Sequence, residues 1–143
     1  MSVAAVADLG KVYRGFREPS GEVTVLVGNQ YLSPAASLKI RNHSPTGFEW
    51  GYGGSWPAQL ALAILLDFFD GDAGKAEDLY QEFKFRVVSA LPRLENWTLT
   101  GCEIHAHVEA ILKRRKQAHA ARNAAGGQAQ RWCEVCGAYI GEM

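Results

Sequence analysis

The sequence predicts an α+β fold, in which about three α-helices pack on one face of a small antiparallel sheet of three or four strands. Two observations lead to this prediction. Strand-like segments are grouped within the first 52 residues, and helical periodicity takes over from residue 57. Strands grouped before helices are typical of an α+β domain. With 143 residues, 48% hydrophobic and 21% charged, the chain is long enough to bury an ordinary globular core.

Three early segments are expected to be strands, at residues 11–16, 23–27 and 37–41. The sequence VTVLV at 23–27 is rich in β-branched residues and is bounded by Gly21 and Gly28. The sequence SLKIR at 37–41 alternates polar with apolar residues, as a strand with one solvent-exposed face does. A further short strand is expected at 97–99.

Residues 44–52 are predicted to form a turn and the returning strand of a hairpin. Ser44, Pro45 and Gly47 suit the first, second and fourth positions of a type I turn. The sequence FEWGY at 48–52 would then run back along the sheet with its aromatic side chains on one face.

Three helices are predicted after this hairpin. The first begins near Pro57, with Ser55 or Trp56 at its cap, and it is apolar nearly all round to residue 69, which indicates a buried position. The second covers residues 72–91 and is amphipathic. The third opens with a capping box formed by Thr100 and Glu103.

We expect a compact domain at residues 1–117, followed by a linker and tail at 118–143. Residues 118–130 are mostly Ala, Gly and Gln and offer little to bury. Fifteen basic and fifteen acidic residues cancel, which argues against a global attraction to nucleic acid or membrane. The longest apolar run is far shorter than the ~20 residues that a membrane span needs, and the N-terminus lacks a secretory pattern. These features lead us to expect a cytoplasmic protein without a membrane partner.

The segment HSPTGFEWGYGGSWPAQL at 43–60 is the candidate binding site. Glycines before a helix N-terminus let the backbone approach a phosphate or carboxylate, and the free N–H groups there attract anions. Neighbouring aromatic rings could stack on a planar, nucleotide-like molecule. The alternative is that these residues serve only a sharp turn into a buried helix. The predicted ligand-binding residues are His43, Ser44, Trp50, Tyr52, Gly53, Gly54, Ser55, Trp56 and Gln59.

An enzyme that acts through His43 and Glu49 is a further alternative. No serine, cysteine or second carboxylate is spaced to complete a triad with them. We therefore predict no catalytic residue and favour a binding protein.

A Cys-x-x-Cys motif in the tail indicates half of a zinc ribbon. Its residues, Cys133 and Cys136, are followed by a glycine. Cys102 and His105, one turn apart on the third predicted helix, could supply two further ligands to a zinc ion. A redox pair and two incidental thiols are the alternatives.

Four consecutive basic residues, Lys113, Arg114, Arg115 and Lys116, end the third predicted helix. Cations there favour the helix dipole, so a solvated helix end explains them. A nucleic-acid-binding patch, combined with the zinc motif, is the alternative, and its binding would fall steeply with salt.

The stretch NHSPTGFEWGYGGS at 42–55, followed by PAQLALA at 57–63, resembles a domain family of unknown function. Its members are found in phages, plasmids and integrated mobile elements. The segments 13–15, 83–84 and 97–100 are also similar to that family, so the resemblance covers about residues 12–112. Trp56 departs from the family, which usually has glycine or another small residue there.

The resemblance implies a mobile-element accessory protein rather than a reaction. Together with the loop, it leads us to expect a non-enzymatic protein that binds an anionic small molecule, or a host or defence protein, in a counter-defence role. The oligomeric state is not predicted.

Overall fold

The computed structural model describes residues 10–126. Its sheet has four strands in the order β3-β2-β1-β4, and every neighbouring pair is antiparallel. The strands are β1 (Val12–Arg17), β2 (Val23–Val27), β3 (Gln30–Tyr31) and β4 (Trp97–Thr100). The predicted α+β class and the strands at 11–16, 23–27 and 97–99 are therefore confirmed, while the two-residue β3 was not predicted.

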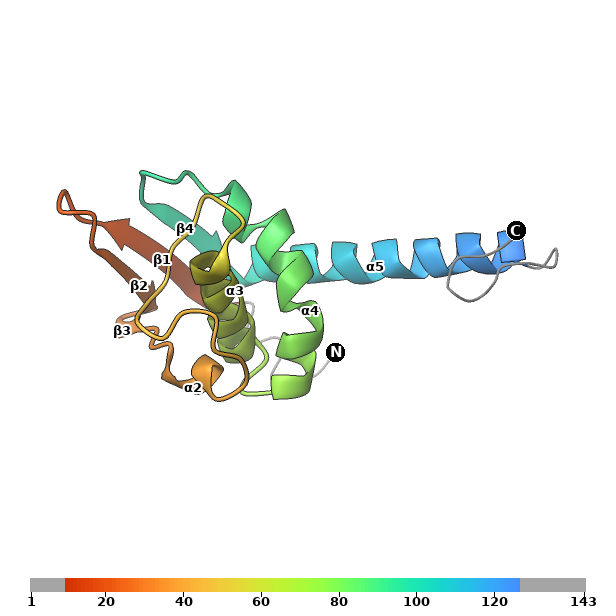
Figure 1. The fold of residues 1–143 in the computed structure, drawn as a ribbon, viewed down its shortest axis with the longest axis horizontal. Helices are drawn as coiled ribbons and strands as arrows, with labels where there is room; N and C mark the ends of the chain where they lie inside the picture. The colour runs from red at the N-terminus through yellow and green to blue at the C-terminus, as the bar shows by residue number, and fades with distance from the viewer. Residues whose placement is uncertain (1–9, 127–143) are drawn as a thin grey trace. The chain divides into compact units, whose positions relative to one another are not determined.

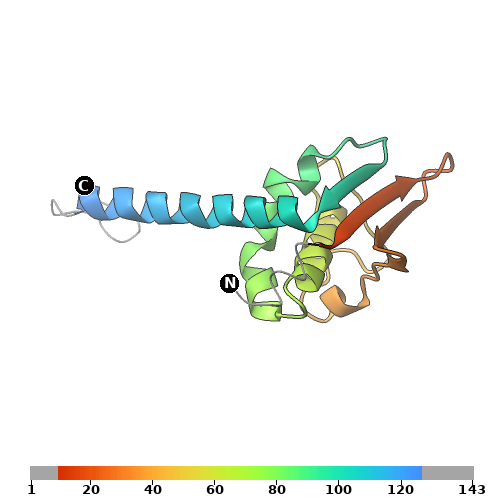
Figure 2. The same cartoon turned by 180° about the vertical axis from the view of Figure 1, so that it is seen from behind.

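Within residues 10–126 four α-helices accompany this sheet, and a short 3₁₀-helix, η1 (Val88–Ala90), follows the third of them. The α-helices are α2 (Ala35–Leu38), α3 (Ser55–Phe68), α4 (Ala73–Arg86) and α5 (Gly101–Gly126). Figure 1 shows α3 between the sheet and α4, and Figure 2 shows the same order from behind. This position explains why α3 is apolar all round, because it meets the sheet on one side and α4 on the other.

The register of the sheet places its buried side chains on one face. Tyr13 and Gly15 of β1 lie opposite Leu99 and Trp97 of β4, and all four are buried. A Cβ atom at Gly15 would lie 2.2 Å from the Trp97 ring nitrogen. Gly15 therefore leaves room for the indole to lie across β1.

The predicted strand at 37–41 is wrong, because Ala35–Leu38 form the short helix α2. The Leu38 N–H donates to the Pro34 carbonyl at 2.9 Å, and the Arg41 N–H donates to Ser37 at 3.0 Å. These local bonds replace the ladder of a sheet. The polar–apolar alternation also misread the burial, because the polar Ser37 is the buried residue of this segment while Leu38 and Ile40 are half-buried.

The returning strand predicted at 48–52 is also wrong, because this segment joins no strand of the sheet. Phe48 and Trp50 are buried as their alternation suggests. The backbone N–H of Gly51, however, donates to the carbonyl of Val88 at 3.0 Å rather than to a neighbouring strand. The segment is thus an extended loop that packs against η1.

The N-termini of α4 and α5 carry side-chain caps, whereas that of α3 does not. The Thr100–Glu103 capping box is confirmed: each backbone N–H donates to the other side chain, at 2.8 and 3.1 Å. Asp72 caps α4 by accepting from the Lys75 N–H at 3.1 Å. The cap of α3 is Gly54, not Ser55 or Trp56, and it offers no side-chain hydrogen bond.

The chain divides into two compact units after Val108, and α5 continues from the first unit into the second. Residues 118–126, the first part of the predicted linker, belong to α5. The rest of the predicted tail lies outside the described residues. None of the helices in residues 10–126 is both long enough and apolar enough to cross a membrane.

Candidate functional site

The N-terminus of α3 is exposed and lacks a side-chain cap. Its first intrahelical hydrogen bond runs from the Ala58 N–H to the Gly54 carbonyl at 3.1 Å. The N–H groups of Ser55 and Trp56 precede this bond and have no intrahelical acceptor. Both residues are exposed, and N–H groups at a helix N-terminus, together with the helix dipole, attract anions.

Gln59 fixes the loop that leads to this helix and does not face solvent. Its side-chain oxygen accepts from the backbone N–H groups of His43 at 2.7 Å and Ser44 at 3.0 Å. Its amide nitrogen donates to the Ser37 hydroxyl at 2.8 Å and to the Arg41 carbonyl at 3.1 Å. Since Gln59 is fully buried and all its bonds are used, it positions the loop rather than touching a ligand.

Ser44 and Trp50 of the predicted site are also fully buried. The Ser44 hydroxyl donates to the Gly47 carbonyl at 3.0 Å, which closes the turn. The Trp50 ring nitrogen donates to the carbonyls of Pro92 and Glu95, at 3.1 and 3.2 Å. Both side chains hold the loop in place from inside the protein.

His43 is held by Tyr80 of α4, with the ring Nε2 and the phenol oxygen 2.7 Å apart. Burial lowers the pKa of His43 below its usual value of 6.5, and the positive charges of Lys84 and Arg41 lower that pKa further. The imidazole is therefore neutral at pH 7 and acts here as a hydrogen-bonding group.

Glu49, the suggested partner of His43 in an enzyme, is held by a different residue. Arg17 forms a two-pronged ion pair with the Glu49 carboxylate and lies 4.8 Å from the centroid of the Trp50 ring. The hydrogen bond from Arg17 lowers the pKa of Glu49, although burial opposes this shift. A carboxylate fixed in this way is a poor proton acceptor for chemistry with His43.

A basic and aromatic surface lies beside the cap of α3, and we name it the cap surface. It arises because α3 and α4 are joined by a short connection and run antiparallel, so the last turn of α4 flanks the first turn of α3. The Phe85 ring would lie 3.4 Å from a Cβ atom added at Gly53. The cap surface comprises Tyr52, Gly53, Ser55, Lys84, Phe85 and Arg93.

Two cations of the cap surface rest on aromatic rings. The Lys84 ammonium is 4.1 Å from the centroid of Phe85, and the Arg93 guanidinium is 4.8 Å from that of Tyr52. Phe85 is 65% exposed, whereas Lys84 is only 7% exposed. Among the described residues Lys84 forms neither a hydrogen bond nor an ion pair, so its charge is left to the ring and to solvent.

Three residues of the cap surface, Lys84, Phe85 and Arg93, were not predicted from the sequence. One signal was present: Phe85 stands two positions after the inward Phe83, which places an aromatic side chain on the polar face of an amphipathic helix. Lys84 gave no such signal, because its position near His43 and beside the Phe85 ring depends on the packing of α4 against α3.

Trp56 lies apart from the basic part of this surface. It is 41% exposed and lines a cavity of about 360 Å³ together with Gly47, Phe48 and residues of β2. The carboxylates of Glu22 and Glu49 also line that cavity, which makes it unfavourable for an anion.

The predicted metal ligands are only partly described. Cys102 is exposed and His105 half-buried near the start of α5, while Cys133 and Cys136 lie outside the described residues. Residues 10–126 contain no cluster of three or more His, Cys, Asp or Glu side chains that could hold a metal ion. The zinc site that includes the tail stays a prediction.

The basic run lies on the part of α5 that belongs to the second unit. Lys113, Arg114 and Lys116 are exposed, and Arg115 is half-buried. Their contribution to nucleic-acid binding stays a prediction as well.

Comparison with known proteins supplies a family but not a reaction. No curated protein and no solved structure matches the chain. The model of a family of unknown function, DUF6166, matches residues 13–110, which is more than half of the sequence and includes the whole 43–59 loop. The chain therefore belongs to DUF6166, a family of unknown function.

Proposed function

We propose that the protein is a non-enzymatic binding protein that captures an anionic group, a carboxylate or a phosphate, at the cap surface. The group is carried either by a small ligand or by an acidic segment of a host protein. The free N–H groups of Ser55 and Trp56 would receive the anion, and Lys84 would neutralise it.

The observation that carries this proposal is that the positive charge of Lys84 is not paired with a negative charge of another described residue. The stem of the Lys84 side chain is buried, whereas its ammonium group reaches solvent and lies over the Phe85 ring, without a hydrogen bond or ion pair to another described residue. Its charge is therefore available to pair with an anion. An anion at the cap of α3 would pair with this charge and with the positive end of the helix dipole at once.

The aromatic rings of the cap surface, of which Phe85 is exposed and Tyr52 half-buried, support recognition of more than a bare ion. Phe85 and Tyr52 each carry a cation, so the cap surface combines aromatic contact area with positive charge. Aromatic and arginine side chains are enriched at sites that dominate protein–protein binding. A role in a mobile element, acting against a host defence, is the biological setting that the family resemblance suggests for such a binding protein.

The test is a titration of isotopically labelled protein, followed through the amide signals of Ser55 and Trp56. The two probes are inorganic phosphate and a glutamate-rich peptide. We expect saturable shifts of both amides with at least one probe, and loss of these shifts in Lys84→Met, which keeps the apolar stem but removes the charge.

Lys75→Met is the matched control, because Lys75 is also on α4 and its ammonium also lies over an aromatic ring, 5.7 Å from the centroid of Phe69. That variant should bind as the wild type does. Absence of saturable shifts with both probes would contradict the proposal, and so would equal effects of the two substitutions.

A further inference from the structure

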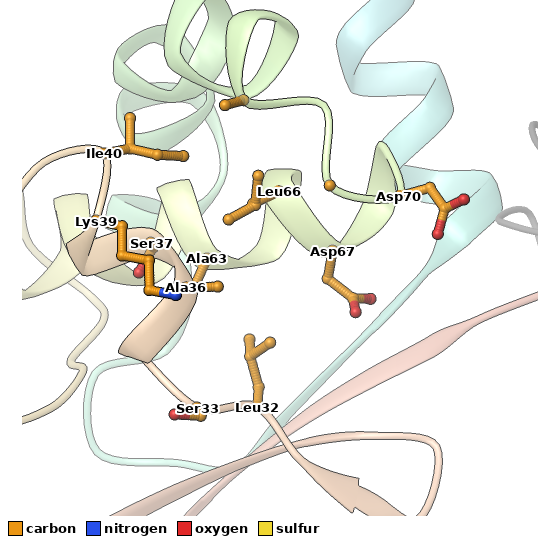
Figure 3. Close-up of a pocket in the computed structure, with 12 residues that line it drawn as sticks. Leu32, Ser33, Ala36, Ser37, Lys39, Ile40, Ala63, Leu66, Asp67 and Asp70 are labelled. Atoms are coloured by element: carbon orange, nitrogen blue, oxygen red, sulfur yellow. The ribbon is translucent and has the colours of Figure 1, made fainter.

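A second candidate site lies at the opposite end of α3, in a groove between α2 and α3. Its volume is about 460 Å³, within the range of roughly 300–1,000 Å³ that small-molecule sites have. Figure 3 shows Leu32, Ala36, Ala63 and Leu66 gathered around its centre. The middle of the groove is therefore apolar.

The two ends of the groove carry opposite charges. Asp67 and Asp70 lie at one end and Lys39 at the other, as Figure 3 shows. Asp67 is already engaged, because its carboxylate accepts from the Lys11 ammonium at 3.1 Å and from the Tyr13 hydroxyl at 2.7 Å. Asp70 and Lys39 are exposed, and neither forms an ion pair with another described residue.

We propose that this groove binds a linear zwitterion: an aliphatic chain with an ammonium group at one end and a carboxylate at the other. The ammonium would face Asp70, the carboxylate would face Lys39, and the methylene groups would cover the apolar centre. The order of charges and apolar surface along the groove matches this ligand and no simpler one. A diamine would bring a cation to Lys39, and a dicarboxylate would bring an anion to Asp70.

The backbone at Asp70 permits a clean test. Asp70 has a φ of +57°, a left-handed conformation that asparagine also tolerates well. Asp70→Asn therefore removes the charge without straining the turn between α3 and α4. Lys39→Gln does the same at the other end, on an exposed side chain.

The experiment measures binding of four probes of equal chain length by calorimetry or ligand-observed NMR. The probes are 6-aminohexanoate, hexylamine, hexanoate and 1,6-diaminohexane. We expect 6-aminohexanoate to bind most tightly. Each substitution should weaken its binding by about threefold, the size expected for one exposed ion pair. Asp70→Asn should not weaken the binding of hexanoate, which has no ammonium group for Asp70. Lys39→Gln should not weaken the binding of hexylamine, which has no carboxylate for Lys39.

Shorter and longer probes, 4-aminobutanoate and 8-aminooctanoate, test whether both charges are bound at once. An affinity maximum at one chain length supports the proposal, because the two charged ends are a fixed distance apart. A steady rise of affinity with length, equal binding of hexylamine and 6-aminohexanoate, or no binding at all would overturn it. The control Glu95→Gln removes an exposed charge outside the groove and should change nothing.

This inference is independent of the proposed function, because the groove shares no residue with the cap surface. Loss of zwitterion binding in Asp70→Asn should leave the amide shifts of Ser55 and Trp56 intact, and Lys84→Met should leave zwitterion binding intact.

Discussion

Replacing Gln59 with leucine should destabilise the protein strongly, although leucine has a similar size and suits a buried helix. The side chain of Gln59 is fully buried and forms four hydrogen bonds. Gln59→Leu leaves the N–H groups of His43 and Ser44 and the carbonyl of Arg41 without this partner. The Ser37 hydroxyl keeps its bond to the Pro34 carbonyl, at 2.9 Å, and so loses less.

The expected loss of stability depends on how well water can replace the hydrogen bonds of the Gln59 side-chain amide. The Ser44 N–H is buried and bears the full cost of an unsatisfied donor, about 1–3 kcal/mol. The His43 N–H and the Arg41 carbonyl are only partly buried, so water can recover some of their bonding. After the gain from burying an apolar side chain, we expect a net loss of about 2–4 kcal/mol of unfolding free energy. A typical domain has only ~5–15 kcal/mol in total.

Urea denaturation measures this loss directly, with the slope of the transition compared between variants. The control is Gln81→Leu, because Gln81 is exposed and, among residues 10–126, its side chain bonds only to the Tyr80 hydroxyl, at 3.1 Å. That variant should change stability by less than ~0.5 kcal/mol. A loss below ~1 kcal/mol for Gln59→Leu, or equal losses for both variants, would refute the view that Gln59 holds the loop.

Four further predictions concern the loop, its histidine, the start of α5 and the tail. Gly51→Ala should lower the free energy of unfolding by about 2 kcal/mol or more, because φ is +88° there and an added Cβ atom would lie 2.4 Å from the Cβ atom of Arg93. Gly53→Ala meets only an ordinary contact at 3.4 Å and should leave unfolding by denaturant nearly unchanged; similar losses at both positions would contradict the loop geometry. Because the pKa of His43 is lowered on folding, the unfolded chain takes up this proton first, so stability should fall as the pH drops below about 6.5. His43→Gln should remove its part of that fall, and an NMR titration giving a His43 pKa at or above 6.5 would disprove the assignment. Thr100→Ala should cost about 1 kcal/mol through loss of the capping box, measured by thermal unfolding, and no change would argue against that cap. If two further ligands complete the site of Cys133 and Cys136, metal analysis of the full chain should find about one zinc ion per chain. A metal-free protein would rule out this zinc site.

Elements with local signals could be predicted from the sequence. The strand at 23–27 followed from its β-branched residues, and α3 followed from an apolar run that begins at a proline. The capping box at Thr100 could be predicted because both partners lie within one turn of the same helix. In each case the hydrogen-bond partners are close in sequence, or the burial pattern fits one element only.

Segments whose partners are distant in sequence could not be predicted in this way. The alternation in 48–52 correctly indicated the burial of Phe48 and Trp50, but it could not tell a strand from an extended loop. The alternation in 37–41 failed for burial as well, because the polar Ser37 is buried by its bonds to Pro34 and Gln59. The loop at 48–52 bonds to η1 and to the residues around Pro92, about 40 positions further along the chain.

The candidate site divides in the same way. The sequence by itself determined that glycines precede an exposed helix N-terminus, since Gly53, Gly54 and Ser55 are consecutive residues beside a proline. Only the tertiary structure decided that Gln59 and Trp50 are internal supports and that Lys84 and Phe85 complete the surface. Those roles depend on α4 lying antiparallel to α3, and long-range packing of this kind leaves no fixed spacing in the sequence.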